Sequence, residues 1–487
     1  MHRYDTLPRS ILTVIACSLA TILSFLTMAI GKARAEPSEF HVSTGQRQLF
    51  LDDQGIASID NLHRKMHQPT KRGAVIRSPK PEKTIQTRTA PVWDPHAKVY
   101  KLWVLGIDQN LWQSEDGLNW TPGPKTNMRI DMAVYDPNES DPSRRFKAPL
   151  LNDGFAVSPD GVQWTKLDVK KIQSSDEGNF SYDAEGGMYI HTVKRGGKHG
   201  RSVALATSRD FETWTELGLI FQADDDDQQL GQRKIEARLA DPTLQQPLYN
   251  DPKAYNVDVY NMGVFRYESL YIGLPAMFHA TGPVPNYPNT DGFQVIELVC
   301  SQDLKNWKRL DDRQAFIGPS HLDSGAYDLT QILPPSAPVV RDDELWFYYT
   351  GLKWRSSFHY KGEYPQGETV PIPGRDRDGG AVCLAVLRRD GFVSLDAGKN
   401  EGIALTRPFT LAADKLYVNV DARNGEMTVE ACDDQGKTLA RSEVVKGDHC
   451  QIELSWEQGS LVELKQQSVR LRFKLRNASL YSYWMAD

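Results

Sequence analysis

The sequence predicts an all-β protein: a five-bladed β-propeller followed by a C-terminal β-sandwich. Short runs rich in Val, Tyr, Phe, Trp and Ile dominate after residue 85, and Asp-Pro, Asp-Gly and Gly-Gly turns separate them. A motif of serine, aspartate and tryptophan recurs along these runs at the spacing of propeller blades. Beyond about residue 400 this motif is absent, and strands of alternating polarity follow one another, as is typical of a sandwich.

Residues 1–35 are typical of an export signal peptide. Basic residues precede an apolar run over residues 11–30, and the small-x-small sequence Ala-Arg-Ala ends at residue 35. We therefore expect a secreted or periplasmic protein. A retained membrane anchor and a lipoprotein processed at Cys17 are the alternatives, since the run is about long enough to span a bilayer.

The charge of the chain bears on its partners. Removing the leader, which holds four basic residues and one acidic residue, changes the formal net charge from −6 to −9. A mildly acidic chain argues against nucleic acid or an anionic membrane as partner and is compatible with a carbohydrate substrate.

The sequence does not indicate the oligomeric state. Four cysteines remain after the leader, and they are consistent with either disulfides or separate core thiols: Cys300, Cys383, Cys432 and Cys450.

The repeated motif has the form S-x-D-x-x-x-W. Its four copies are SEDGLNW from Ser114, SPDGVQW from Ser158, SRDFETW from Ser208 and SQDLKNW from Ser301. The first two intervals are 44 and 50 residues, which matches a blade of four strands. Each copy follows an apolar strand and ends at the start of the next. We therefore expect the aspartate to bind the turn amides and the indole to fill the wedge between blades.

The third interval is 93 residues, nearly twice the others. We interpret residues 222–256, which have little strand character, as a long insertion in blade four rather than as a degenerate blade. A fifth unit follows, in which Asp390-Gly391 repeats the turn without its tryptophan. The predicted domains are the propeller over residues 36–399, with residues 36–85 packing on it, and the sandwich over residues 400–487. The sandwich could bind carbohydrate or cover one side of the propeller.

Three segments carry a family resemblance: LFLDDQGIASIDNLHRKMHQP, the repeated motif, and LRRDGFVSLDAG leading to a sandwich that ends in NASLYSYW. With them the chain resembles the five-bladed β-propeller glycoside hydrolases of families 32, 43, 68 and 117. Within that superfamily it is similar to exported bacterial glycosyl-hydrolase-like proteins with a C-terminal β-sandwich. The resemblance implies carboxylates at the starts of the innermost strands, because hydrolysis needs one acid to protonate the leaving oxygen and another to attack or activate water.

On this resemblance three acids are the catalytic candidates. Asp131 in RIDMAVYDP matches the position that holds the sugar, although the family's proline is absent. Glu177 in DEGNFSYD has the spacing of the general acid, with Asp176 as a one-residue alternative. Asp258 in VDVYNMGVF begins an inner strand beside Tyr260, which is a candidate substrate-binding residue.

Blade one departs from the family pattern. Where the family has an aspartate that serves as nucleophile or base, the strand TIQTRTAPVWDP has Arg88 and Thr89. Asp94 lies at the far end of this strand and is interpreted as a turn residue. Asp258 could supply the base from across the funnel, or Asp323 in SHLDSGAYD could.

Arg88 and His279 could bind substrate hydroxyls or a carboxylate. Trp354 could stack on a sugar, since it begins a long aromatic loop in blade five, WRSSFHYKGEYPQGETVPIPGRDRDGG, that could reach over the funnel. The acidic run Asp224–Asp227 could bind a structural calcium ion, but a solvated loop is the simpler interpretation, and we assign no cofactor and no metal.

The sequence thus favours an exported glycoside hydrolase in which Glu177 is the acid and Asp258 or Asp323 is the base or nucleophile. A propeller that binds glycans without cleaving them is the main alternative, because the blade-one acid is missing. A sialidase-like enzyme is less well supported. The sialidase motif is one residue longer, and such enzymes have six blades and three convergent arginines, which the sequence does not identify.

Overall fold

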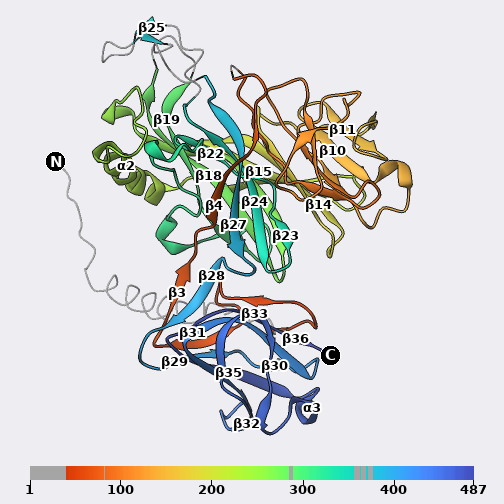
Figure 1. Cartoon of the computed structure of the whole chain (residues 1–487), viewed down its shortest axis with the longest axis vertical. Helices are drawn as coiled ribbons and strands as arrows, with labels where there is room; N and C mark the ends of the chain where they lie inside the picture. Colours follow the sequence, from red (N-terminus) through yellow and green to blue (C-terminus); the bar gives the residue numbers. More distant parts are fainter. Residues whose placement is uncertain (1–39, 82, 285–288, 356–361, 364–368, 371–376) are drawn as a thin grey trace, which may run out of the picture. The chain divides into compact units, whose positions relative to one another are not determined.

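The computed structural model describes residues 40–81, 83–284, 289–355, 362–363, 369–370 and 377–487. By its internal contacts, the segment 42–487 forms one unit, and the following description concerns that unit. Its described residues contain five antiparallel sheets of four or five strands, one two-stranded sheet and one larger sheet (Figure 1). The structure confirms the all-β class, the five-bladed propeller and the C-terminal sandwich.

The first three blades each contain four antiparallel strands in chain order. Blade one contains β5 (Val92–Asp94), β6 (Val99–Trp103), β7 (Leu111–Ser114) and β8 (Thr121–Pro122). Blade two contains β9 (Val134–Tyr135), β10 (Phe146–Leu150), β11 (Gly154–Ser158) and β12 (Thr165–Lys166). Blade three contains β13 (Gly178–Asp183), β14 (Met188–Gly197), β15 (Gly200–Ser208) and β16 (Thr215–Phe221).

The last two blades have additional strands. Blade four contains β17 (Asn256–Tyr267), β18 (Leu270–Pro283), β20 (Val299–Ser301) and β21 (Lys308–Arg309), with β19 (Thr290–Ile296) also paired to β18. Blade five contains β22 (Gln331–Leu333), β24 (Glu344–Leu352), β27 (Gly380–Arg388) and β4 (Thr70–Arg77), with β23 (Val339–Arg341) also paired to β24. A separate pair, β25 (Gly362–Glu363) and β26 (Thr369–Val370), lies between β24 and β27 in the chain.

The ring of blades is closed by a strand from the beginning of the chain. β4 precedes blade one, yet it pairs with β27 as the outer strand of blade five (Figure 1). A hydrogen bond also joins blade five to the segment before blade one: the amide of Thr87 donates to Oγ1 of Thr350, in the second strand of blade five, at 2.8 Å. A propeller closed in this way leaves few unpaired strand edges, which is a general need of β proteins.

The larger sheet of the sandwich contains strands from both ends of the chain. Its N-terminal strands are β1 (Gln48–Leu49), β2 (Ile56–Asp60) and β3 (Leu62–Met66). Its C-terminal strands are β28 (Val393–Ala397), β29 (Gly402–Thr406), β30 (Phe409–Thr410), β31 (Lys415–Cys432), β32 (Thr438–Ser442), β33 (Val445–Glu453), β34 (Trp456–Gln458), β35 (Ser468–Arg476) and β36 (Ser479–Ala486). The first strands of the described residues therefore belong mostly to the sandwich, and β28 already lies in this sheet before residue 400.

The helical segments are few. They are α2 (Asp225–Ala240), α3 (Leu461–Leu464) and the 3-10 turns η1 (Pro142–Arg144), η2 (Pro252–Ala254), η3 (Asp311–Arg313) and η4 (Leu322–Ser324).

The acidic run that was interpreted as a solvated loop is instead the start of α2. Asp224 caps the helix and shares a reciprocal capping box with Asp227, whose side chain is buried. Arg313 bonds both carboxylates, at 2.5 and 2.6 Å. These aspartates therefore cap and anchor the helix, and the described residues contain no group of three or more ligand-type side chains that could hold a metal ion.

The four copies of the repeated motif close the hairpins between the third and fourth strands of blades one to four. In the copy from Ser158, the carboxylate of Asp160 accepts hydrogen bonds from the amides of Val162 and Gln163, both at 2.8 Å. Trp164 donates to the carbonyl of Gly161 and packs against a tryptophan of blade one, Trp103, at 6.0 Å between ring centres. The predicted roles of the aspartate and the indole are confirmed.

The residue after the motif's aspartate always has a left-handed backbone conformation. Gly117 and Gly161 have φ values of 77° and 71°, which glycine adopts without strain. Phe211 and Leu304 adopt φ 64° at the same position in the third and fourth copies. Both side chains are buried, so packing of the side chain compensates the unfavourable backbone conformation there.

We expect the Asp160→Ala variant to lose about 1–2 kcal/mol of unfolding free energy, because two turn amides lose their acceptor. Urea denaturation followed by tryptophan fluorescence measures this loss. Asp153→Ala is the matched control, because the Asp153 side chain is exposed and pairs only with Lys166 at the surface. Equal stability of the two variants would contradict the structural role of the motif.

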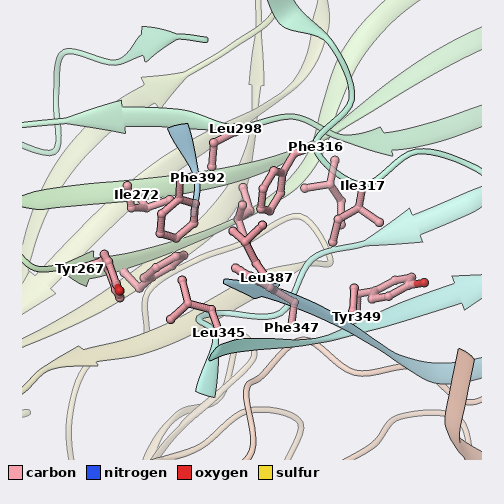
Figure 2. Close-up of a cluster of buried hydrophobic side chains, with 14 of the residues drawn as sticks. Tyr267, Ile272, Leu298, Phe316, Ile317, Leu345, Phe347, Tyr349, Leu387 and Phe392 are labelled. Atoms are coloured by element: carbon pink, nitrogen blue, oxygen red, sulfur yellow. The ribbon is translucent and has the colours of Figure 1, made fainter. Parts of the chain in front are cut away.

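Apolar cores fill the spaces between blades. The core between blades four and five includes Phe316, Phe347 and Phe392, whose rings gather between strands of the two blades (Figure 2). Cys300 and Cys383 are buried in the same core. All four cysteines of the described residues have free thiols, which excludes disulfides among them.

Among the described residues, no helix is both long and apolar enough to cross a membrane. The predicted leader, residues 1–35, lies outside them.

Candidate active site

The starts of the innermost strands define one end of the propeller axis. Neighbouring strands of a blade are antiparallel, so the start of the first strand lies beside the end of the second and beside the connection from the second to the third. Glu177 directly precedes β13, and Asp258 and Tyr260 lie in the first half of β17. Arg88 and Asp131 precede β5 and β9 by a few residues. The five residues chosen from the sequence therefore lie at the same end of the inner strands.

Arg88 and Glu177 form a bidentate ion pair between blades one and three. Arg88 Nε and Nη2 donate to the two carboxylate oxygens of Glu177 at 2.5 and 2.8 Å, and the two residues are 4% and 9% exposed. Burial lowers the pKa of Arg88, but the charge and hydrogen bonds of Glu177 outweigh it and leave the pKa raised. The residue that replaces the expected blade-one acid thus holds the carboxylate of blade three.

Asp258 pairs with an arginine from a neighbouring blade. Arg201 Nε donates to Asp258 Oδ2 at 2.8 Å, and Asp258 is 6% exposed. The other carboxylate oxygen is buried and has no hydrogen-bond partner among the described residues. Burial raises the pKa of Asp258, and Arg201 only partly opposes this effect. Asp258 is therefore a carboxyl group that favours its protonated form more than an exposed aspartate does.

Arg201 reaches Asp258 because the β14–β15 hairpin is longer than the inner strand beside it. β13 pairs with β14 only as far as Val193, whereas the hairpin continues to the pair Gly197 and Gly200. Lys194 also lies on this extension. Its ammonium group is 3.8 Å from the ring centre of Tyr260 and 2.6 Å from an oxygen of Asp176.

Tyr260 and Phe278 are the shared neighbours of the cations. The guanidinium carbon of Arg201 is 5.2 Å from the Tyr260 ring centre and 4.5 Å from that of Phe278. The guanidinium carbon of Arg355, which follows β24 of blade five, is 5.9 and 4.8 Å from the same rings. Burial raises the pKa of Tyr260, and the negative charge of Glu177 adds to this effect. Residues of blades one, three, four and five therefore meet around one phenol.

We call this group the funnel cluster. It comprises Arg88, Asp176, Glu177, Lys194, Arg201, Asp258, Tyr260, Phe278 and Arg355. Lys194, Arg201 and Arg355 were not predicted from the sequence, because the resemblance implies acids at the inner strands and gives no role to these cations. The basic sequence KRGGKHGR over residues 194–201 is the signal that could have identified two of them.

Asp131 lies at the edge of the funnel cluster. Its carboxylate pairs with the exposed Arg129 at 2.7 Å, and its charge contributes to the raised pKa of Arg88. It lines a cavity of about 330 Å³ at blade two, together with Asp153 and Lys166 among others. A neighbouring cavity of about 550 Å³ also includes Arg129.

The remaining sequence candidates lie elsewhere. His279 is adjacent to Phe278 in β18 and therefore faces the opposite side of the blade, where it stacks on Phe293 at 4.8 Å. Burial lowers the pKa of His279 to about 3, so the ring is neutral and part of the blade packing. Asp323 is exposed in η4 and has no ion pair among the described residues.

Trp354 is half-buried and directly precedes Arg355 of the funnel cluster. Three further aromatic residues of the same loop lie outside the described residues: Phe358, Tyr360 and Tyr364.

Side chains of blade three also hydrogen-bond to the backbone of the other blades near the funnel cluster. Asn179 Nδ2 donates to the carbonyls of Arg88 in blade one and Pro334 in blade five, at 2.8 and 3.3 Å. Thr192 donates to the carbonyl of Met262 in blade four at 2.8 Å. These bonds join the inner segments of blades one, three, four and five to one another, next to the carboxylates of the funnel cluster.

Comparisons with known proteins give distant structural likeness. No protein-family model matches the sequence, and no curated protein matches it. An N-acetylgalactosamine deacetylase from F. plautii, in complex with blood group B trisaccharide, is 14% identical, with 72% of this chain and 96% of that chain covered and a TM-score of 0.36. A GH32 β-fructofuranosidase from Bombyx mori is 10% identical, with coverages of 86% and 94% and a TM-score of 0.34. An endo-arabinase from Bacteroides thetaiotaomicron is 13% identical, with coverages of 61% and 94% and a TM-score of 0.32. These identities and TM-scores are too low to assign a function to this chain.

Proposed function

We propose that the protein is an exported glycoside hydrolase that cleaves glycosidic bonds of an oligosaccharide or polysaccharide at the funnel cluster. The observation that carries this proposal is the presence of two carboxyl groups with opposite environments at the same end of the propeller. Glu177 accepts both bonds of an arginine fork, whereas Asp258 is buried with one oxygen unbonded among the described residues. When two carboxyl groups have environments that differ in this way, one can stay protonated and act as the acid while the other is ionised and acts as the base.

The two environments favour a division of roles that reverses the assignment made from the sequence. Asp258, with its raised pKa, is suited to donate a proton to the glycosidic oxygen as the bond to the anomeric carbon breaks. Glu177, held by Arg88, is suited to attack the anomeric carbon or to accept a proton from the attacking water. Water supplies the hydroxyl group of the new reducing end. Asp131 and Tyr260 contact the sugar in this proposal.

The proposal predicts a specific pH dependence. The raised pKa of Asp258 means that this group stays protonated to higher pH than an ordinary aspartate, so kcat/KM falls only as the pH rises through that raised value. In Asp258→Asn the fall on the alkaline side is absent and kcat is lower by about 10²- to 10⁴-fold. pH–rate profiles on a cleaved glycan measure both effects.

Asp323→Asn is the comparator in this experiment, because Asp323 is exposed and outside the funnel cluster. We expect its profile to match that of the wild type. An unchanged profile for Asp258→Asn together with a collapsed rate for Asp323→Asn would transfer the acid role to Asp323 and contradict the proposal.

A glycan-binding propeller without catalysis is the second candidate function. Arg88 favours it, because an arginine occupies the position where the resemblance implies a catalytic aspartate. Cleavage of no glycan by the wild type, with retained binding, would support it.

The structure has one feature of a sialidase-like enzyme, three neighbouring arginines, but not the six blades. Arg88, Arg201 and Arg355 do lie around Tyr260, but the propeller has five blades rather than six. We therefore do not propose a sialidase.

A further inference from the structure

The helix α2 binds the start of β17, the strand that carries Asp258. Gln228 of α2 is half-buried, and its side-chain amide donates to the carbonyl of Val257 at 2.8 Å. The backbone amide of Val257 in turn donates to the side-chain oxygen of Gln228 at 2.9 Å. One glutamine thus holds both backbone polar groups of the residue directly before Asp258, as the facing residue of an antiparallel strand would.

The packing of α2 against β17 is close. Gly231 is buried in α2, and a methyl group at this position would overlap Cγ2 of Val257 and contact the ring of His279 in β18. Ile235 belongs to the same apolar core as Val257. Gln228, Gly231 and Ile235 have the i, i+3 and i+7 spacing of one helix face, so this face of α2 contacts the start of β17.

The helix is also anchored to the later part of blade four. Arg313, which follows β21, pairs with Asp224 and Asp227 at the start of α2. Lys234 pairs with the buried carboxylate of Glu297, between β19 and β20, at 2.8 Å. Partly buried ion pairs of this kind are screened less than pairs in open solvent. α2 is therefore held in place by contacts other than those with β17, and it provides a fixed support for that strand.

The start of β17 also contacts the hairpin that carries Arg201. Asn256 Nδ2 donates to the carbonyl of His199 at 3.0 Å, and Arg201 Nε donates to Asp258 Oδ2 at 2.8 Å. Strand ends are the places where a sheet opens most easily. Both the burial of Asp258 and its pairing with Arg201 therefore depend on what holds the first residues of β17 in place.

We infer that α2 positions Asp258 for proton transfer and that Gln228 is the residue through which it does so. This inference rests on the proposed function, because it adds a positioning residue to the same site. Without the two hydrogen bonds of Gln228, the first residues of β17 separate more easily from the blade, and water reaches the carboxyl group. A displacement of about 1 Å can lower a rate roughly 10²-fold. Gln228 acts through Asp258, so the loss is expected in kcat.

Gln228→Met tests the inference, because methionine has nearly the same length but cannot donate a hydrogen bond and accepts one only weakly. We expect kcat to fall about 10- to 100-fold while KM changes only a few-fold. We also expect the alkaline fall of kcat/KM to move to lower pH, because a carboxyl group that gains water loses part of the burial that raises its pKa. Arg201 and Lys194 are the charged groups that act on Asp258, and the variant keeps both.

Two controls separate positioning from a general loss of stability. Gln232→Ala changes an exposed glutamine of the same helix, whose side chain bonds to Glu236 at 2.9 Å, and wild-type kinetics are expected from it. Asp160→Ala lowers the stability of blade two and should leave the pH profile unchanged. Gly231→Ala displaces α2 from β17 and is expected to reproduce both effects of Gln228→Met, which keeps the test valid if that variant does not fold.

A measurement without turnover separates this inference from the proposed function. Carbon-13 NMR of aspartate-labelled protein gives the pKa of Asp258, with Asp258→Asn assigning its signal. A lower pKa in Gln228→Met than in the wild type supports the positioning role, and if no glycan is cleaved it does so while the hydrolase proposal fails. An unchanged pKa would overturn the inference and leave the hydrolase intact wherever the wild type cleaves a glycan.

Discussion

Glu177→Gln is expected to lower kcat by about 10²- to 10⁴-fold while glycan binding changes only a few-fold. The amide has nearly the shape of the carboxylate, and its oxygen can still accept one of the two hydrogen bonds from Arg88. It cannot attack the anomeric carbon or accept the proton of water. Initial rates on a cleaved glycan, together with titration of the same glycan, separate kcat from binding.

Two further variants show whether the loss of activity is specific to the carboxylate of Glu177. Glu185→Gln changes an exposed carboxylate in the turn at the opposite end of β13, and we expect wild-type kinetics from it. Glu177→Asp keeps the charge that Arg88 needs but withdraws it from the reacting atoms, so an intermediate rate is expected with near-normal stability. Equal loss of activity in Glu185→Gln, or normal turnover by Glu177→Gln, would remove Glu177 from the mechanism.

Asp390→Ala is expected to have the largest effect on stability, about 3–5 kcal/mol of unfolding free energy. Asp390 is fully buried and accepts hydrogen bonds from Arg47 at 2.6 Å, Tyr267 at 2.7 Å and Ser482 at 2.6 Å. These partners belong to the N-terminal segment, to blade four and to the sandwich strand β36. Alanine would leave the charge of Arg47 and two hydroxyl groups without their shared acceptor.

The stability of Asp390→Ala is measured by urea denaturation, with Asp343→Ala as the control. Asp343 lies in the exposed turn between β23 and β24, and its loss is expected to cost less than about 0.5 kcal/mol. Asp390→Asn keeps the size and one acceptor oxygen, so it should fall between the two. If Asp390→Ala is as stable as the control, the buried carboxylate does not join these three parts of the chain.

The repeated motif made the propeller predictable from the sequence. Each copy is a local turn in which the serine, aspartate and tryptophan contact residues within a few positions, so its geometry is encoded in one short segment. Counting from these turns located the starts of β13 and β17, and with them Glu177 and Asp258. It also identified the position of Arg88, where an acid was expected.

Features that depend on distant pairing could not be predicted in the same way. β4 pairs with β27 across some 300 residues of chain, and no local pattern indicates its partner. The helix α2 was missed because its buried positions follow a helical spacing but two of the four are charged, Asp227 and Arg238. The sequence of α2 therefore lacks the apolar periodicity of an amphipathic helix, although one face of the helix is buried.

The cations of the funnel cluster were missed for a related reason. Lys194 and Arg201 come from a hairpin extension whose length depends on how far β14 and β15 pair beyond β13. Arg355 follows a middle strand of blade five. The family resemblance directed attention to acids at inner strands, whereas the structure shows that residues after the second strand of a blade reach the same place.

Cleavage in oxygen-18-labelled water, followed by mass spectrometry of the products, tests the central claim most directly. A hydrolase in which Glu177 and Asp258 act on the glycosidic bond transfers one oxygen of the solvent to the new reducing end. We therefore predict a single labelled oxygen at that end with the wild type, and a rate of labelled-product formation that is about 10²- to 10⁴-fold lower with Glu177→Gln. Products that carry no label, such as the unsaturated sugars formed by elimination, or the absence of cleavage of both neutral and anionic glycans, would contradict it.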